Sequence, residues 1–85
     1  MDNTSIYVAI DFDKNGSPLT VTSHDSLERA KGALHMRLQC YADEHVIEWK
    51  PIYDFDNLID RYIPEEKSQY RNQAVIYKTV LNNRY

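Results

Sequence analysis

The stretch SIYVAIDFDKNGSPLTVT, residues 5–22, decides the fold that the sequence predicts. Side-chain character alternates with a period of two along both of its halves, which is the spacing of a β-strand. Between the halves, Asn15-Gly16 favours the positive φ values of a tight hairpin turn. We therefore expect a hairpin of two strands, residues 5–12 and 18–22. Ile6, Val8, Ile10 and Phe12 share one face of the first strand, Tyr7 and Ala9 keep the other face partly apolar, and Leu19 and Val21 of the second strand are predicted to face the core.

A helix is predicted next, over about residues 26–42. Asp25-x-x-Glu28 has the spacing of a capping box at its start. Apolar side chains then recur at helical spacing on two nearly opposite stripes, so the helix needs two packing partners. The sheet supplies one partner, and either the C-terminal segment or a second chain supplies the other. The first stripe comprises Leu27, Ala30, Leu34, Leu38 and Tyr41, and the second comprises Ala33, Met36 and Cys40.

The C-terminal half of the chain has weaker patterning. Residues 46–50 alternate as a third strand does, and a right-handed crossover would place it beside the first strand and parallel to the second. Residues 54–62 are expected to form a short helix. Residues 74–81 fit both a helix and a strand, and their β-branched side chains favour the strand. The apolar side of the expected short helix comprises Phe55, Leu58, Ile59 and Tyr62.

The predicted fold class is therefore α+β, with residues 1–85 as a single small domain. A ββαβ core spans residues 5–50, and residues 51–85 are an appended C-terminal extension. The expected sheet is mostly antiparallel with three or four strands, and one main helix covers one of its faces.

Composition narrows the class of protein. A hydrophobic content of 42% excludes a disordered tail. No apolar run approaches the roughly 18 residues that a membrane helix needs, and the polar, acidic N-terminus does not have the pattern of a signal peptide. The single cysteine excludes an intramolecular disulfide. We therefore expect a cytoplasmic protein without a membrane partner.

The first turn matches half of a calcium loop. Asp11, Asp13 and Asn15 stand at positions 1, 3 and 5, with Gly16 at position 6. The second half does not match, because Thr22 stands at position 12, where an acidic ligand belongs. Turns are rich in Asp and Asn without any metal. We therefore expect no metal ion, and keep Asp11, Asp13 and Asn15 as an alternative cation site.

No group of residues has the pattern of a catalytic site. The three histidines lack metal-ligand spacing, and two glycines are too few for a phosphate-binding loop. Cys40 lies on an apolar helix stripe, where a thiol is inert. We therefore expect a protein that is not an enzyme and holds no cofactor.

Aromatic and acidic residues gather in the C-terminal half. Several of the seven tyrosines lie in residues 51–85, and residues 43–66 carry eight acidic and two basic residues. Tyrosine is enriched at protein interfaces. We therefore predict a partner-binding surface in this region, which comprises Tyr53, Asp54, Asp56, Asp60, Tyr62, Glu65, Glu66 and Tyr70.

The sequence also fits two other kinds of association, homodimer formation and nucleic-acid binding. The second helix stripe, Ala33, Met36 and Cys40, would form a homodimer interface if a second chain covered it. The basic tail, residues 67–85, carries four basic and no acidic residues and places aromatic side chains beside them, which suits weak nucleic-acid binding. The net charge of the chain is −3, however, so nucleic acid is not the expected primary partner.

Residues 6–50 resemble small phage and prophage accessory proteins, in which a strand, a turn, a second strand, a helix and a short third strand follow one another. Members of that group, anti-CRISPR inhibitors among them, bind a host or defence component. The resemblance implies a non-enzymatic inhibitor or modulator that covers a site on a larger protein in the host cytoplasm. The segments that carry it are Ile6-Tyr7-Val8-Ala9-Ile10, Asp25-x-x-Glu28-x-Ala30 and Ile47-Glu48-Trp49.

Overall fold

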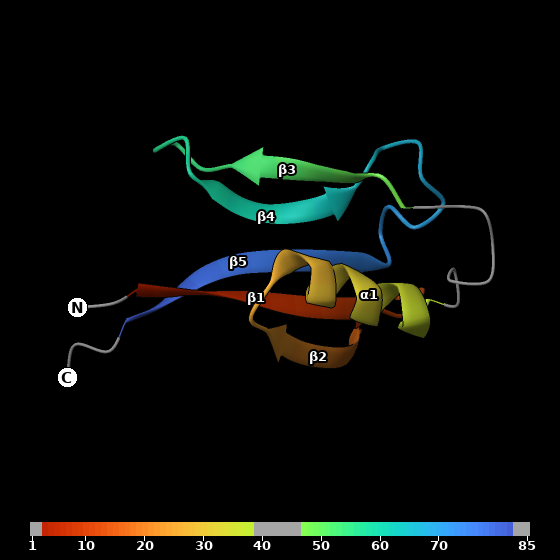
Figure 1. Cartoon of the computed structure of the whole chain (residues 1–85). Coiled ribbons are helices and arrows are strands. Elements are labelled where there is room, and N and C mark those ends of the chain that lie inside the picture. The colour runs from red at the N-terminus through yellow and green to blue at the C-terminus, as the bar shows by residue number, and fades with distance from the viewer. Residues whose placement is uncertain (1–2, 39–46, 83–85) are drawn as a thin grey trace.

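Along the chain, two strands are followed by a helix and three more strands (Figure 1). The computed structural model describes residues 3–38 and 47–82. The predicted α+β class and the strand near the C-terminus are confirmed, but the sheet has five strands instead of three or four. The elements are β1 (Asn3–Phe12), β2 (Pro18–His24), α1 (Leu27–Arg37), β3 (Trp49–Tyr53), β4 (Ile59–Pro64) and β5 (Ala74–Asn82).

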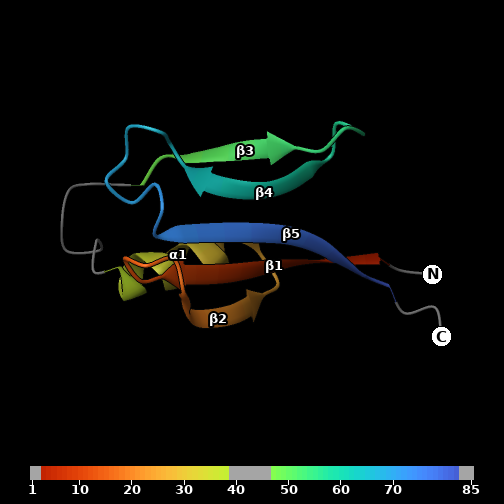
Figure 2. The same cartoon turned by 180° about the vertical axis from the view of Figure 1, so that it is seen from behind.

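The strands lie in the order β2-β1-β5-β4-β3, and each neighbouring pair is antiparallel (Figure 2). The predicted crossover is therefore wrong, because β3 lies at the far edge beside β4 and not beside β1. Residues 51–85, predicted as an appended extension, supply β4 and β5. Since β5 lies between β1 and β4, this part of the chain completes the sheet.

The prediction of a short helix over residues 54–62 is wrong. A turn occupies its first half, and β4 begins at Ile59. The apolar spacing resembles that of a helix. Phe55 and Leu58 nevertheless belong to the turn, where their side chains are largely exposed. Only from Ile59 onward do the side chains alternate between the faces of the sheet.

The helix α1 begins one residue later than the capping box predicts. Ser26 is the N-cap, and its Oγ accepts a hydrogen bond from the N–H of Arg29 at 3.2 Å. Asp25, the expected cap, instead forms an exposed ion pair with Arg29. The helix ends at Arg37 with Leu38 as its C-cap, and the remaining positions of the expected helix, residues 39–42, lie outside the described residues.

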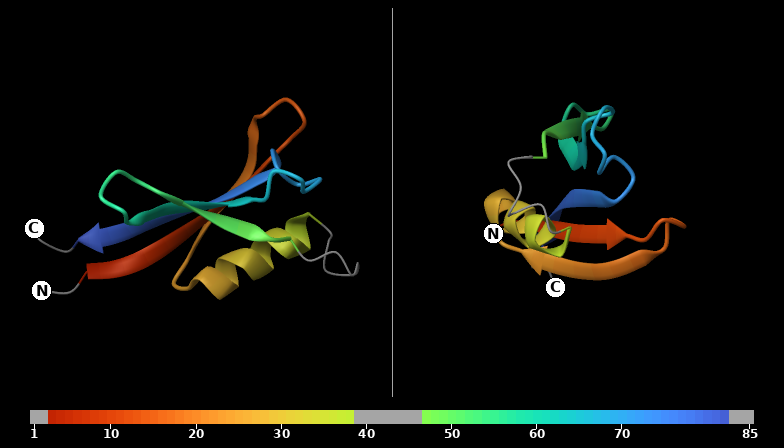
Figure 3. Two further views of the ribbon diagram at one scale, coloured as in Figure 1. Left: turned by 90° about the horizontal axis from the view of Figure 1, so that it is seen from above. Right: turned by 90° about the vertical axis from the view of Figure 1, so that its right-hand side faces the viewer.

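One face of the sheet is covered by α1, as the views from above and from the side show (Figure 3). The core prediction for β2 is wrong, because Leu19 and Val21 are 63% and 58% exposed on the opposite face. Small side chains of β1 and β5 face the helix instead and allow it to approach closely. The buried cluster is formed by Ala9, Ala30, Leu34, Ala74 and Ile76, with Tyr7, Leu27, Leu38, Trp49 and Tyr62 packed against it.

A largely buried ion pair joins α1 to the sheet. Arg37 Nε lies 3.1 Å from Asp11 Oδ1. The same guanidinium donates through Nη1 to Thr22 Oγ1 at 3.0 Å and through Nη2 to the carbonyl of Ala9 at 3.1 Å. Arg37 therefore holds the last turn of the helix against both β1 and β2, and Asp11 has a structural partner within the chain.

Candidate functional site

The turn between β1 and β2 is fixed by a side chain. Asp13 Oδ1 accepts hydrogen bonds from the backbone N–H groups of Asn15 at 2.8 Å and Ser17 at 2.9 Å. The backbone N–H of Asp13 donates to the Ser17 carbonyl, and that of Gly16 to the Asp13 carbonyl. Gly16 has a φ of 86°, in the left-handed region that glycine enters freely.

The turn between β3 and β4 repeats this pattern bond for bond. Asp54 Oδ1 accepts from the N–H groups of Asp56 at 2.8 Å and Leu58 at 3.1 Å. The backbone N–H of Asp54 donates to the Leu58 carbonyl, and Asn57, with a φ of 62°, donates to the Asp54 carbonyl. Both hairpins thus carry the same hydrogen-bonded five-residue turn, in which Asp13 is equivalent to Asp54 and Lys14 to Phe55.

The two turns differ in what they expose. Phe55 is 95% exposed, and Leu58 and Tyr53 beside it are 65% and 56% exposed. The equivalent turn of the first hairpin exposes the polar residues Lys14 and Asn15. We call Tyr53–Leu58 the hairpin tip; it lies at the end of the β3–β4 hairpin away from the connection to β5 (Figure 1).

The predicted partner-binding residues lie at two ends of β4. Tyr53, Asp54 and Asp56 belong to the hairpin tip, whereas Glu65, Glu66 and Tyr70 lie in the turns after Pro64. Asp60 forms an ion pair with Arg61. Tyr62 packs against the buried cluster under α1. The sequence reasoning missed Phe55 and Leu58 as site residues; the repeated Asp-x-Asn/Asp-Gly/Asn pattern is the signal that could have revealed the turn.

The two alternative sites, the predicted cation site and the predicted dimer stripe, lie in different surroundings. Asp11 pairs with Arg37 and Asp13 binds its own turn, and no cluster of three or more His, Cys, Asp or Glu residues able to hold a metal ion occurs within residues 3–38 and 47–82. On the predicted dimer stripe, Met36 is 69% exposed and Ala33 is half-buried. Cys40 lies outside the described residues.

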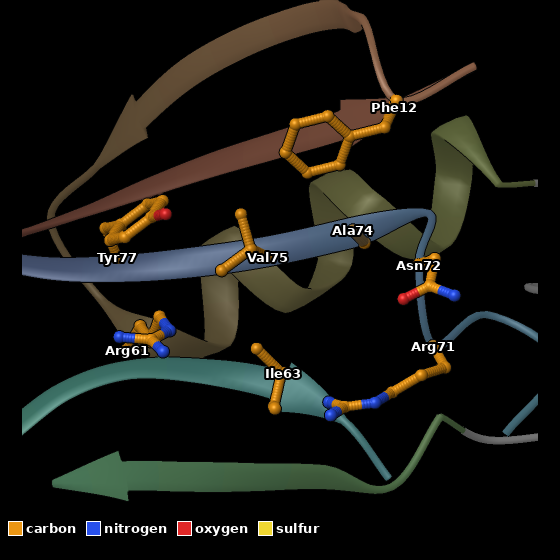
Figure 4. Close-up of a pocket in the computed structure, with 9 residues that line it drawn as sticks. Phe12, Arg61, Ile63, Arg71, Asn72, Ala74, Val75 and Tyr77 are labelled. Atoms are coloured by element: carbon orange, nitrogen blue, oxygen red, sulfur yellow. The ribbon is translucent and has the colours of Figure 1, made fainter. Parts of the chain in front are cut away.

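A shallow pocket of about 380 Å³ opens on the sheet face away from α1 (Figure 4). Phe12, Ile63 and Val75 form an apolar floor, and in Figure 4 the ribbon of α1 lies behind the sheet. Arg61 and Arg71 stand at the rim. Arg61 is paired with Asp60, and Arg71 Nη1 donates to the Pro64 carbonyl at 3.4 Å.

The lining of this pocket can hold an apolar group that carries a carboxylate. None of its lining residues is a histidine, a cysteine or a carboxylate, so the lining offers no general base at neutral pH. The basic residues of the tail are divided: Arg71 borders this pocket, while Lys78 is paired in register with Tyr7 of the core face. Among the described residues, the basic tail therefore does not form one continuous cationic surface.

Burial shifts the pKa values of two titratable side chains, His35 in α1 and Tyr62 in β4. Burial, and then the positive charge of Lys31, lowers the pKa of His35 below its usual 6.5. Burial, and then the phenols of Tyr7 and Tyr53, raises the pKa of Tyr62 above its usual 10.0. Both groups therefore favour the neutral form.

Comparison with protein-family models, curated proteins and solved structures finds no match to this chain. Within the described residues, no helix has both the length and the apolar character needed to cross a membrane.

Proposed function

We propose that this protein is a non-enzymatic protein-binding module that inserts its hairpin tip into an apolar pocket of a larger partner. One observation carries the proposal: Phe55 is 95% exposed on a turn that does not need it. The equivalent turn has the same hydrogen bonds with Lys14 at that position. The turn geometry therefore does not explain an aromatic side chain there, whereas a binding role does.

The tip has the physical properties of an interface anchor. Burying a phenylalanine side chain contributes roughly 1.5–3 kcal/mol, and a few buried aromatic residues dominate most interfaces. The Asp54 carboxylate and the backbone bonds of the turn hold Phe55 in place before binding. Little backbone entropy is then lost when the partner binds, so more of the burial energy becomes affinity.

The charges around the tip indicate the chemistry of the partner. Asp54 and Asp56 flank Phe55 on both sides, and Asp60 follows at the start of β4. The nearest cations along the chain are Lys50 and Arg61, and Arg61 is already paired with Asp60. A pocket rimmed by lysine or arginine side chains would complement this surface. The phage-like resemblance of residues 6–50 makes a host or defence protein the first class of partner to test.

The experiment compares matched substitutions in the two turns. Immobilised wild-type protein, Phe55→Lys and Lys14→Ala are exposed to the same lysate, and retained proteins are quantified by mass spectrometry. The affinity of a purified retained protein is then measured for each variant. We expect Phe55→Lys to weaken binding by about tenfold or more, since a hot-spot aromatic costs about 2 kcal/mol when lost, and Lys14→Ala to leave it unchanged. Equal binding by wild type and Phe55→Lys would overturn the proposal, as would the absence of any retained protein.

A further inference from the structure

The two edges of the sheet differ in their protection against pairing with another strand. β3 has five residues and carries Lys50 and Pro51, and proline has no N–H to donate to a neighbouring strand. β2 has seven residues, and its stretch Leu19–Ser23 contains no charged residue, proline or glycine. Natural edge strands usually carry such residues because an unprotected edge recruits other strands. β2 begins with Pro18, but the rest of its edge, Leu19–Ser23, lacks this protection.

Exposed apolar side chains accompany the open backbone of β2. Val21 is paired in register with Ile10 of β1 on the uncovered face of the sheet, and Leu19 lies two residues earlier, at the irregularity in the pairing of β2 with β1. This face lies opposite α1, and both side chains are more than half exposed. An added strand would therefore gain hydrogen bonds from the backbone of β2 and cover Leu19 and Val21 at the same time.

We propose that β2 is a self-association edge on which β2 of a second copy of this chain pairs in the antiparallel direction. A two-fold axis perpendicular to the sheet would join two five-stranded sheets into one of ten strands. Both α1 helices would lie on the same face of that sheet. The occupant is an identical chain because each β2 supplies what the other needs: a free strand edge and apolar side chains on the uncovered face.

The charges at the two ends of β2 also suit this pairing. Lys14 precedes the strand and has no ion-pair partner within the described part of the chain. Asp25 follows the strand and is two-thirds exposed, with Arg29 at 3.4 Å. In an antiparallel pair of β2 strands, the beginning of one lies beside the end of the other. Lys14 of each copy would therefore approach Asp25 of the other.

The dimer would leave the hairpin tips accessible. β3 and β4 lie at the opposite end of the strand order from β2. Two copies joined through β2 would carry their tips at the two outer edges of the joint sheet. The self-association edge is thus separate from the surface under "Proposed function", and either proposal can fail without the other.

The test is the molar mass of the protein in solution, measured by multi-angle light scattering over a range of concentrations. The wild type is expected to approach twice the chain mass of 10.0 kDa as concentration rises. Val21→Lys should remain a monomer, because a lysine on an edge strand blocks pairing. The control is Val80→Lys, a substitution of a valine that is 51% exposed in β5, where it is paired with Ser5 of β1 and lies away from the β2 edge. It should dimerise like the wild type.

A second variant separates edge pairing from packing between sheet faces. Tyr77 lies on the uncovered face of the central strand β5, so Tyr77→Lys would prevent two faces from stacking but would leave the β2 edge free. We expect this variant to dimerise and circular dichroism to show all variants folded. A wild type that stays at the mass of one chain would overturn the proposal. A dimeric Val21→Lys, or a Tyr77→Lys that is monomeric, would also overturn it.

Discussion

On the sheet face that α1 covers, the side chains of β1 and β5 include two alanines, the larger Tyr7 and Ile76, and the charged Asp11 and Lys78. On the opposite face, the same strands carry large apolar side chains. The helix therefore packs on the less hydrophobic face, where Ala9 and Ala74 allow close approach and Arg37 reaches Asp11. The covered face is represented by Ala9, Asp11, Ala74 and Ile76, and the uncovered face by Val8, Ile10, Phe12, Val75 and Tyr77.

This difference shows that total hydrophobicity does not decide which face of a sheet is covered. Close packing requires complementary shapes, and the side chain of Leu34 fills the space above two alanines. The larger side chains of the uncovered face bury one another only in part, apart from Val75, which is 6% exposed. The stability of the domain should therefore depend mainly on the covered face, whereas association should depend on the uncovered face and the edges.

The largest expected effect concerns two of the ion-paired arginines, Arg37 and Arg61, one on each side of this comparison. Arg37→Met should destabilise the protein by about 3 kcal/mol, because it leaves the buried carboxylate of Asp11 without its partner. Arg61→Met removes a partly exposed pair with Asp60 and should cost under about 1 kcal/mol. Urea unfolding of both variants measures the difference. Equal losses would mean that the two faces contribute alike.

A leucine on each face provides the second test. Leu34→Ala removes a fully buried side chain and should cost about 2–3 kcal/mol. Leu19→Ala removes a side chain that is 63% exposed and should cost about 0.5 kcal/mol or less. The midpoints of urea unfolding, compared at dilutions where the protein is a monomer, check this prediction. A loss of the same size for Leu19→Ala would contradict the assignment of the core.

The covered face should also make stability depend on pH. Since burial and Lys31 lower the pKa of His35, the unfolded chain binds this proton more readily than the folded protein does. The contribution is complete above the usual pKa of 6.5 and is lost as the pH falls through that value toward the lower folded pKa. Unfolding curves between about pH 7.5 and pH 5.5 should show this loss, and His35→Gln should reduce it.

A control from the other face makes this test specific. Tyr77→Phe should leave the pH dependence unchanged, because Tyr77 lies on the uncovered face, away from α1 and His35. Glu28 and Glu48 line the same hollow as His35, so the effect of His35→Gln is compared with that of Glu28→Gln and Glu48→Gln. An unchanged slope in His35→Gln would show that another group is responsible.

Much of the fold could be predicted from short-range patterns. The β1–β2 hairpin follows from its period-two alternation and from Asn15-Gly16, and β5 follows from its β-branched residues. The covered face could not be predicted, because β1 is partly apolar on both sides. The choice depends on Arg37 and Ala74, which are distant in sequence. The strand order also depends on contacts between residues that are distant in sequence, since the pairing of β5 with β1 places β5 in the centre of the sheet.

The candidate site was predicted as a region but not as a structure. The residue types of Tyr53, Asp54 and Asp56 predict a partner-binding surface, and these residues do lie at the hairpin tip. The spacing of Phe55 to Leu58 and Ile59 predicts a helix, in which Phe55 would lie on the apolar side. The turn chemistry of Asp54 and Asn57 overrides that spacing, because a side-chain acceptor and a left-handed residue reverse the chain within five residues.

The smallest effect is expected on the outer side of α1, which faces away from the sheet. Gly32 is exposed, and a Cβ added there would meet nothing within 4 Å. Gly32→Ala should therefore stabilise the protein by about 0.5–1 kcal/mol through helix propensity alone. The reverse change on the inner side, Ala30→Gly, should destabilise it by about 1 kcal/mol or more, since Ala30 is fully buried. Thermal unfolding measures both changes. If the outer side of α1, with Ala33 and Met36, were the dimer interface, Gly32→Ala would alter the molar mass in solution. We expect the unfolding temperature to rise and the molar mass to stay the same, because the proposed self-association edge is β2 and not the helix.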